Sequence, residues 1–500
     1  DVIVANHDLV LAELANGGGT LPDPEQVMYI FDEAHHLPGK AQSHFSAHMS
    51  LHGEQRRVLH LRRALQRLAK LPAANNGHDV SLASELAPLS KSIGQALDTV
   101  EELHKALPLP VEALFSSTTA SSHAGDTIEL RLHNGQVPAA LAEIFSELAT
   151  CYRLLDNELR KLQDLLLKQF MPAQDAAQLA REALFASIGD MQSRVQEAQE
   201  VSRSYAQADP PGQPPMARWI KQLSVDSGDF VFHAAPLATA EALSRLAWQP
   251  CFAAVMTSAT LTALDSFDYF IRQVMVPSAG ETALGMASNA FQIEGALNFA
   301  GSQFHVPAMR FDPTQVEGHT AEIVELLPEL IAQSGGTLAL FSSRRQMEAV
   351  HQALPQALRE RCLVQGDRSK KLLLEQHCAR VDEGRQSLLL GLASFAEGLD
   401  LPGAYCQQVI IAKLPFAVPD SPIDEAHSEW VESNGGNAFW DIAVPLASLR
   451  LKQACGRLLR HENDSGRVSL LDTRIVSKRY GERLLQSLPP FDRDIAGRRA

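Results

Sequence analysis

The stretch that decides the fold is residues 27–35, Val-Met-Tyr-Ile-Phe-Asp-Glu-Ala-His, in which an apolar run leads directly into two acidic residues. A continuous apolar run of this length is typical of a strand that is buried on both faces of a parallel sheet. Polar residues at the carboxyl end of such a strand lie at the sheet edge where open α/β proteins place their sites. The stretch therefore predicts an α/β fold with Asp32 and Glu33 at a functional edge.

The composition is that of a soluble globular protein. The length of 500 residues predicts about three domains. The contents of 45% hydrophobic and 21% charged residues exclude a wholly disordered or fibrous chain. The six cysteines include no C-x-x-C pair, so we expect no zinc ribbon and no iron–sulfur site within this sequence. The uncharged run from Leu246 to Leu264 contains too many polar residues for a membrane helix, and we expect a cytoplasmic protein.

Changes in composition along the chain predict its domain organisation. Strand patterns alternate with helical patterns after residue 337, which indicates βαβ units and a parallel sheet. Between residues 41 and 208 leucines recur at helical spacing, for example at 155, 159, 162 and 166. The predicted segments are a first α/β domain (1–40 with 216–265, opening with a strand at Val2-Ile3-Val4), a helical insertion (41–208), a Pro-rich linker (209–215), a connection (266–336) and a second α/β domain (337–500).

The Asp32-Glu33 pair suits phosphoryl transfer from ATP. In that reaction one carboxylate holds Mg²⁺ and another group orients or activates the attacking water. A solvated acidic turn is the alternative, but the preceding apolar strand and the following Ala34-His35 favour a site. Zinc binding by His35 and His36 is a further alternative, although the zinc-protease pattern H-E-x-x-H is absent.

A second candidate motif is Thr257-Ser258-Ala259-Thr260, which also follows an apolar strand pattern, residues 253–256. Its small hydroxyl side chains can donate and accept hydrogen bonds between a nucleotide site and a neighbouring domain. A helix N-cap is the structural alternative for such a tetrapeptide.

A third candidate is residues 453–460, Gln-Ala-Cys-Gly-Arg-Leu-Leu-Arg. On a helix, Gln453, Arg457 and Arg460 would share one face. Two guanidinium groups on that face suit a phosphate that accumulates charge during transfer. An exposed basic helix face is the alternative, but Gly456 inside a helix suggests a specific packing role.

The fourth candidate is residues 394–400, Ser-Phe-Ala-Glu-Gly-Leu-Asp, after the strand pattern at 387–391. A polar loop with Gly398 and the carboxylates of Glu397 and Asp400 suits contact with a ribose, a backbone or a partner loop.

In their order along the chain, the four motifs resemble those of superfamily 2 helicases, in the forms DEAH, TSAT, SFAEGLD and QACGRLLR. More narrowly, the chain resembles the XPD-like branch, and within it the DinG-type helicases. The residues that carry this narrower resemblance are Asn6-His7, LPDP at 21–24, DEAHHLP at 32–38, LVQGD at 363–367, FAEGLDL at 395–401, LPF at 414–416 and DSP at 420–422.

The resemblance implies two RecA-like motor domains, the first incomplete, with an arch-like helical insertion. It also implies an ATP-dependent 5′-to-3′ DNA helicase of repair or replication, a monomer that binds single-stranded DNA and duplex junctions. Asp32 would hold Mg²⁺ through the nucleotide, and Glu33 would activate the hydrolytic water. The other roles it implies are coupling of nucleotide state to DNA (His35, Thr257, Ser258, Thr260), contact with the γ-phosphate (Gln453, Arg457, Arg460) and a place at the nucleotide or interdomain cleft (Glu397, Gly398, Asp400, Gly456).

Two departures from this family pattern matter. No G-x-x-x-x-G-K-[ST] occurs in the 500 residues, since Gly39-Lys40 lacks the upstream glycine and the hydroxyl. None of the six cysteines matches the family's cluster-binding positions. We therefore expect an N-terminally truncated chain, with a [4Fe–4S] cluster only in the full-length protein.

Two other functions stay open. One is a non-catalytic fragment that binds DNA or a partner, and the other is the related bacterial YoaA helicase or an exonuclease-fused relative. The net charge of −15 does not exclude DNA binding, because affinity depends on local patches. Residues 451–500 hold eleven Lys or Arg and six Asp or Glu, and form a locally basic region.

Overall fold

The computed structural model describes residues 2–16, 19–68, 79–117, 121–122, 127–167, 176–223, 229–275, 289–293, 295, 297, 299–331, 335–392, 395 and 398–496. One predicted site residue, Glu397, lies outside this described part. The chain divides into two compact units. The first unit comprises residues 1–28, 36–253 and 419–435, and the second comprises 29–35, 254–418 and 436–500.

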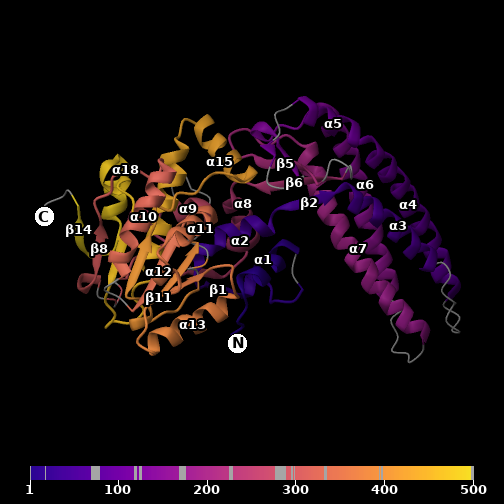
Figure 1. Ribbon diagram of the computed structural model, residues 1–500. Coiled ribbons are helices and arrows are strands. Elements are labelled where there is room, and N and C mark those ends of the chain that lie inside the picture. Colours follow the sequence, from indigo (N-terminus) through magenta and orange to yellow (C-terminus); the bar gives the residue numbers. More distant parts are fainter. Residues whose placement is uncertain are drawn as a thin grey trace. The chain divides into compact units, whose positions relative to one another are not determined.

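The first unit combines long helices with an antiparallel sheet of strand order β2-β6-β5-β4-β3. Figure 1 shows α3, α4, α6 and α7 running side by side. The strands are β2 (Ala47–Ser50), β3 (Ser121–Ser122), β4 (Ile128–Arg131), β5 (Met216–Gln222) and β6 (Phe230–Pro236). The helices are α1 (His7–Asn16), α2 (Leu37–His44), α3 (Leu51–Leu68), α4 (Asp79–Ala106), α5 (Pro108–Ser117), α6 (Ala139–Leu167), α7 (Ala176–Ala206), α8 (Thr239–Leu243) and α15 (Pro422–Ser433).

Residues 41–208 consist mainly of helices, but they also contain strands. The leucines at 155, 159, 162 and 166 are buried along α6, as their spacing predicts. Strands β2 and β4 also arise within residues 41–208, and they pair with β6 and β5. The assignment of β5 and β6 to a RecA-like sheet was therefore wrong. Their apolar patterns predict strands, but a pattern does not identify the pairing partner.

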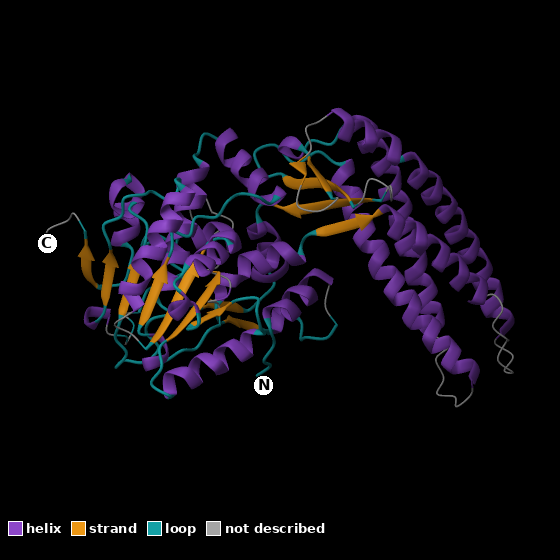
Figure 2. Ribbon diagram, in the orientation of Figure 1, coloured by secondary structure: helices purple, strands orange, loops and turns teal. Residues whose placement is uncertain are grey.

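The second unit is built on a seven-stranded parallel sheet of order β10-β11-β9-β12-β13-β8-β14. Its arrows point the same way in Figure 2. The strands are β8 (Gln303–Val306), β9 (Gly336–Phe341), β10 (Cys362–Val364), β11 (Ser387–Leu392), β12 (Gln408–Ile411), β13 (Arg467–Leu470) and β14 (Asp492–Ile495). The helices are α9 (Asp268–Val274), α10 (Val316–Ile331), α11 (Arg344–Ala353), α12 (Gln356–Arg359), α13 (Lys370–Asp382), α16 (Val444–Cys455), α17 (Arg474–Ser477) and α18 (Arg479–Gln486).

Helices cover both faces of this sheet, as expected for buried parallel strands. Along β9, Leu338 and Leu340 face one apolar cluster, which α13, α16, α17 and α18 complete. The alternate residues Ala339 and Phe341 face a second cluster, which α10, α11 and α12 complete. The predicted α/β architecture is thus confirmed for this unit, and the loop with Gly398 and Asp400 follows the carboxyl end of its strand β11.

Three boundaries differ from the prediction. Strand β8 and helix α10 belong to the second unit's sheet and core, so residues 303–331 are not a connection. Helix α15 belongs to the first unit, where Arg131 pairs with Glu425 and Glu429 at 3.0 and 2.6 Å. Residues 2–4 form no strand, and Val2 and Val4 are 92% and 93% exposed. An apolar run that has no neighbouring strand cannot form the hydrogen bonds of a β-sheet.

The strand before Asp32 is confirmed as β1 (Met28–Phe31), and it pairs with β7 (Ala253–Met256) in a two-stranded sheet. Among the described residues, β1 and β7 are the strands that correspond to the first predicted motor sheet. Among those same residues, none of the helices has the length and apolar character needed to cross a bilayer.

Candidate active site

Asp32 and Glu33 occupy a tight turn directly after β1. The N–H of Glu33 donates to the Asp32 carboxylate, with 3.0 Å between the nitrogen and Oδ1. Glu33 adopts φ +49°, in the left-handed region that non-glycine residues rarely occupy. Such strain is found preferentially at functional sites. The turn leaves the Glu33 side chain 59% exposed, so its carboxylate is accessible to a ligand.

Ser258 connects this turn to the second motif. The Thr257 N–H donates to Phe31, and the Ala34 N–H donates to the Thr257 carbonyl, so the backbones of the two motifs are joined. The Ser258 hydroxyl donates to Glu33 Oε2 at 3.1 Å. Its oxygen lies 2.7 Å from Nδ1 of His35 and 3.2 Å from the Thr260 N–H. The strand ends β1 and β7 thus bring the predicted DEAH and TSAT residues together.

The third motif contacts the second through Gln453. Its Nε2 donates to Thr260 Oγ1 at 3.2 Å. Two further residues of α16, Lys452 and Ser448, strengthen this contact between the second and third motifs. Neither residue was predicted from the sequence. Lys452 Nζ lies 3.2 Å from the Thr262 carbonyl and 3.3 Å from Asp265, and Ser448 Oγ accepts from the Leu264 N–H at 3.2 Å. In the sequence, only its position next to Gln453 could have indicated a role for Lys452.

Arg457 and Arg460 are not on the helix, which corrects the prediction. Helix α16 ends at Cys455 with Gly456 as its C-cap, and the chain then turns through bonds from Arg457 to Ala454 and from Leu458 to Cys455. A Cβ on Gly456 would meet no atom closer than 3.4 Å, and Gly456 has a helical φ of −65°, so neither close packing nor a left-handed turn requires glycine here.

The two guanidiniums nevertheless converge, on the loop that follows β11. Arg457 Nη1 donates to the Leu399 carbonyl at 3.4 Å, and Arg460 Nη2 donates to the same oxygen. Arg460 Nε also lies 3.6 Å from Asp400 Oδ1. In this loop Gly398 has φ +68°, which glycine adopts without strain. The third and fourth motifs therefore form one cluster.

The residues fit Mg²⁺ but not an iron–sulfur cluster. Mg²⁺ is commonly held by one or two carboxylates together with substrate phosphates, and exposed Asp32 can supply such a carboxylate. A [4Fe–4S] cluster requires four thiolates. All six cysteines are free and dispersed, and burial raises the pKa of each thiol, that of Cys362 and Cys406 to about 12. Among the described residues, no three His, Cys, Asp or Glu side chains group in a way that could hold a metal.

The topology and a family comparison define the class of the second unit. Residues 327–491 match the helicase C-terminal domain family. This match covers the strands from β9 to β13 together with the third and fourth motifs, so this part of the second unit is similar to a helicase C-terminal domain.

Relatives extend the similarity to the whole chain. The ATP-dependent DNA helicase DinG of Photobacterium profundum is 36% identical over 499 residues, which are 99% of this chain and 69% of the relative. The protein of that name from Shigella flexneri is 31% identical over 98% of this chain and 66% of its own length. The chain therefore belongs to the DinG family of ATP-dependent DNA helicases, and it spans about two thirds of the length of these relatives.

Among solved structures, S. tokodaii Xpd4 is similar over 93% of this chain and 75% of its own, with 14% identity and a TM-score of 0.48. A structure titled XPD helicase gives 95% and 69% coverage, 14% identity and a TM-score of 0.47. At TM-scores below 0.5, these likenesses add nothing to the family assignment.

Proposed function

We propose that this chain is the motor part of a DNA helicase that hydrolyses ATP and unwinds duplexes with 5′-to-3′ polarity, in DNA repair or replication. The observation that carries the proposal is the hydrogen-bonded sequence Glu33–Ser258–Thr260–Gln453, which joins a hydrolytic carboxylate to the motif that bears two arginines. A merely structural acidic turn requires no such connection.

Each residue has a role in this proposal. Asp32 holds Mg²⁺ on the nucleotide, and Glu33 accepts a proton from the attacking water. Arg457 and Arg460 stabilise the charge on the γ-phosphate when the motor closes, with Gln453 beside them. The remaining predicted residues couple nucleotide state to DNA or line the nucleotide cleft; they are His35, Thr257, Ser258, Thr260, Glu397, Gly398, Asp400 and Gly456.

Tight binding of ATP requires a phosphate-binding loop that these 500 residues do not contain. Apolar side chains on β1 and β7 support a further segment that completes the first sheet, because Ile30 is 64% exposed and Val255 is 47% exposed. We propose that a longer protein supplies this segment, and with it the loop and the cysteines of a [4Fe–4S] cluster. We further propose a cytoplasmic monomer that binds single-stranded DNA and duplex junctions.

The missing loop also favours the second candidate, a non-catalytic fragment that binds DNA or a partner. Strand displacement by the full-length protein separates the two. With ATP, a helicase of the proposed polarity displaces the strand from a duplex with a 5′ single-stranded tail, and not from one with a 3′ tail. Displacement on the 3′-tailed duplex alone contradicts the polarity, and binding without ATP-dependent displacement supports the fragment.

A further inference from the structure

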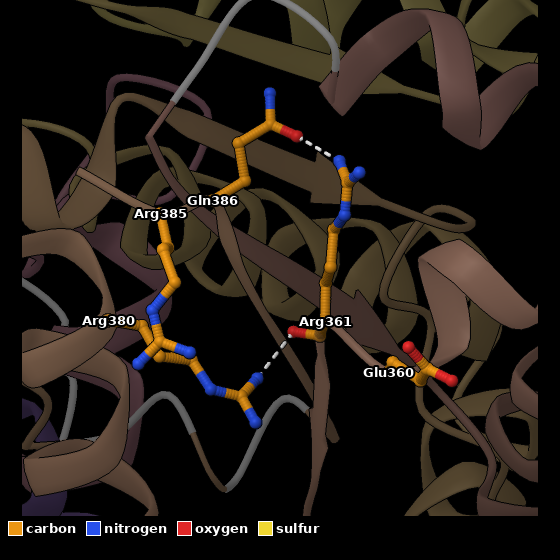
Figure 3. Close-up of a pocket in the computed structure, with 5 residues that line it drawn as sticks. All are labelled: Glu360, Arg361, Arg380, Arg385 and Gln386. Atoms are coloured by element: carbon orange, nitrogen blue, oxygen red, sulfur yellow. Dashed lines mark hydrogen bonds between the residues drawn. The ribbon is translucent and has the colours of Figure 1, made fainter. Parts of the chain in front are cut away.

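A second charged site lies at the opposite edge of the second unit's sheet. A pocket of about 400 Å³ is lined by Glu360, Arg361, Arg380, Arg385 and Gln386 (Figure 3). Arg361 directly precedes β10, and Gln386 directly precedes β11. In a parallel sheet the amino ends of the strands share one edge, whereas the loop with Gly398 and Asp400 follows the carboxyl end of β11. The pocket is therefore separate from the candidate active site.

Neighbouring polar groups hold two of the arginines in place. Arg361 Nη1 donates to the side-chain oxygen of Gln386 at 2.5 Å, and Gln386 Nε2 donates to the Ile331 carbonyl at 3.4 Å. Arg380 Nη1 donates to the Arg361 carbonyl at 3.0 Å. Figure 3 shows both dashed contacts between the lining residues. Side chains fixed in advance lose less conformational entropy when they bind a ligand.

The lining carries more positive than negative charge. Three arginines face one carboxylate, that of Glu360, and outside the lining Arg385 also pairs with Glu383. In Figure 3 the guanidinium groups of Arg380 and Arg385 extend toward the same part of the pocket. Each guanidinium has five N–H donors, so donors remain after the contacts with protein acceptors described above. An anion between the two groups would relieve their mutual repulsion.

We propose that this pocket binds a phosphate group with two negative charges. The planar guanidinium fork matches the oxygens of a phosphate in a bidentate manner, and two adjacent forks suit a dianion better than a singly charged phosphodiester. The same chemistry is offered by a free pyrophosphate or nucleotide and by the terminal phosphate of a DNA strand. This site goes beyond the proposed helicase reaction, since it does not require ATP hydrolysis.

The test is calorimetric titration of the chain with pyrophosphate at low salt. We expect saturable binding that the double variant Arg380→Gln/Arg385→Gln weakens at least about tenfold, as befits the loss of charged hydrogen bonds. Glu360→Gln should tighten binding about threefold, because it removes the one negative charge of the lining. Arg153→Gln, at an exposed arginine in the other unit, is the matched control and should change nothing.

Competition identifies the source of the phosphate. Displacement of pyrophosphate by a 5′-phosphorylated oligonucleotide, but not by its 5′-hydroxyl counterpart, assigns the site to DNA ends; displacement by ATP alone assigns it to free nucleotides. The proposal is overturned if pyrophosphate does not bind saturably, if the double variant binds as wild type does, or if Arg153→Gln weakens binding equally. If the double variant does not fold, the Glu360→Gln result decides, and unchanged or weaker binding by that variant overturns the proposal.

Discussion

Ser258 donates its hydroxyl hydrogen to Glu33, with 3.1 Å between Ser258 Oγ and Glu33 Oε2. Once this hydrogen is used, the same oxygen can only accept, and it has two lone pairs. His35 Nδ1, at 2.7 Å, and the Thr260 N–H, at 3.2 Å, are placed to fill them. His35 Nδ1 also lies 3.2 Å from Glu33 Oε2, so Ser258, Glu33 and His35 form one polar cluster. Under the proposed function, this contact would transmit a change at Glu33 to the second motif.

The first prediction concerns this coupling. Ser258→Ala in the full-length protein should keep ATP turnover within about threefold of wild type, because Glu33 and Asp32 remain. Strand displacement should fall at least about tenfold, since a coupling of about 1.4 kcal/mol is worth a factor of ten. Paired measurements of both rates check it. Ser193→Ala, on the exposed surface of α7, is the control. A proportional loss of both rates would assign Ser258 to the chemical step instead.

The second prediction concerns Arg460. Arg460→Ala should lower kcat for ATP by at least about 10³, the low end for arginine fingers, with a smaller change in KM. Steady-state kinetics of the full-length protein measure both constants. Arg153→Ala is the control. Because Arg460 also contacts Leu399, thermal melting must show an intact fold. A folded variant whose kcat stays within a few-fold of wild type would limit Arg460 to holding that loop.

The sequence predicted which motifs lie together better than it predicted the local geometry of each motif. Described residues of all four motifs do come together, because strand ends and one helix end hold them. The helical placement of Arg457 and Arg460 failed because α16 ends at Cys455, and residue spacing alone does not locate the end of a helix. Lys452 and Ser448 were missed because their contacts depend on a loop with positive φ at Leu264 and Asp265, which tertiary structure imposes.

For the fold, local patterns predicted individual strands but not the pairing between strands that are distant in sequence. The strand pattern predicted at 387–391 coincides with β11 to within one residue, because a fully buried strand is a continuous apolar run. Strand β10 has three residues and β14 is largely exposed, so neither carries that pattern. The pairing of β5 and β6 with strands of the insertion depends on contacts distant in sequence, which no local pattern contains.

The third prediction concerns iron. The purified 500-residue chain should show no absorbance band near roughly 400 nm after anaerobic reconstitution with iron and sulfide, because its thiols are dispersed and their pKa values are raised by burial. Ultraviolet–visible spectra and iron analysis measure this. About four irons per chain, lost on substitution of any of these cysteines, would contradict it.

The fourth prediction concerns pH and the stability of the first unit. Burial raises the pKa of Glu54 to about 7, against the opposing effects of Arg57 and Tyr152. The folded state therefore binds this proton more tightly than the unfolded state. The contribution of Glu54 to the free energy of unfolding should fall as pH rises from 4.5 to about 7, by as much as about 3 kcal/mol.

His104 acts in the opposite direction, because burial lowers its pKa to about 4. Its contribution should rise with pH between about 4 and 6.5, and it partly offsets that of Glu54. The difference between wild type and Glu54→Gln in urea unfolding at each pH isolates the carboxyl group. Exposed Glu147→Gln is the control. A difference that is constant across this range would show that Glu54 titrates normally.

The most direct test of the central claim, that Glu33 is the hydrolytic carboxylate, is DNA-stimulated ATP hydrolysis by the full-length protein carrying Glu33→Gln. The amide keeps the size of the side chain and can still accept the Ser258 hydrogen bond, but it cannot take a proton from water. Loss of a general base costs about 10²–10⁴ in rate, so we expect kcat to fall by at least about 10² while ATP and DNA still bind and the melting temperature is unchanged. Hydrolysis within a few-fold of wild type by the folded variant would contradict the account.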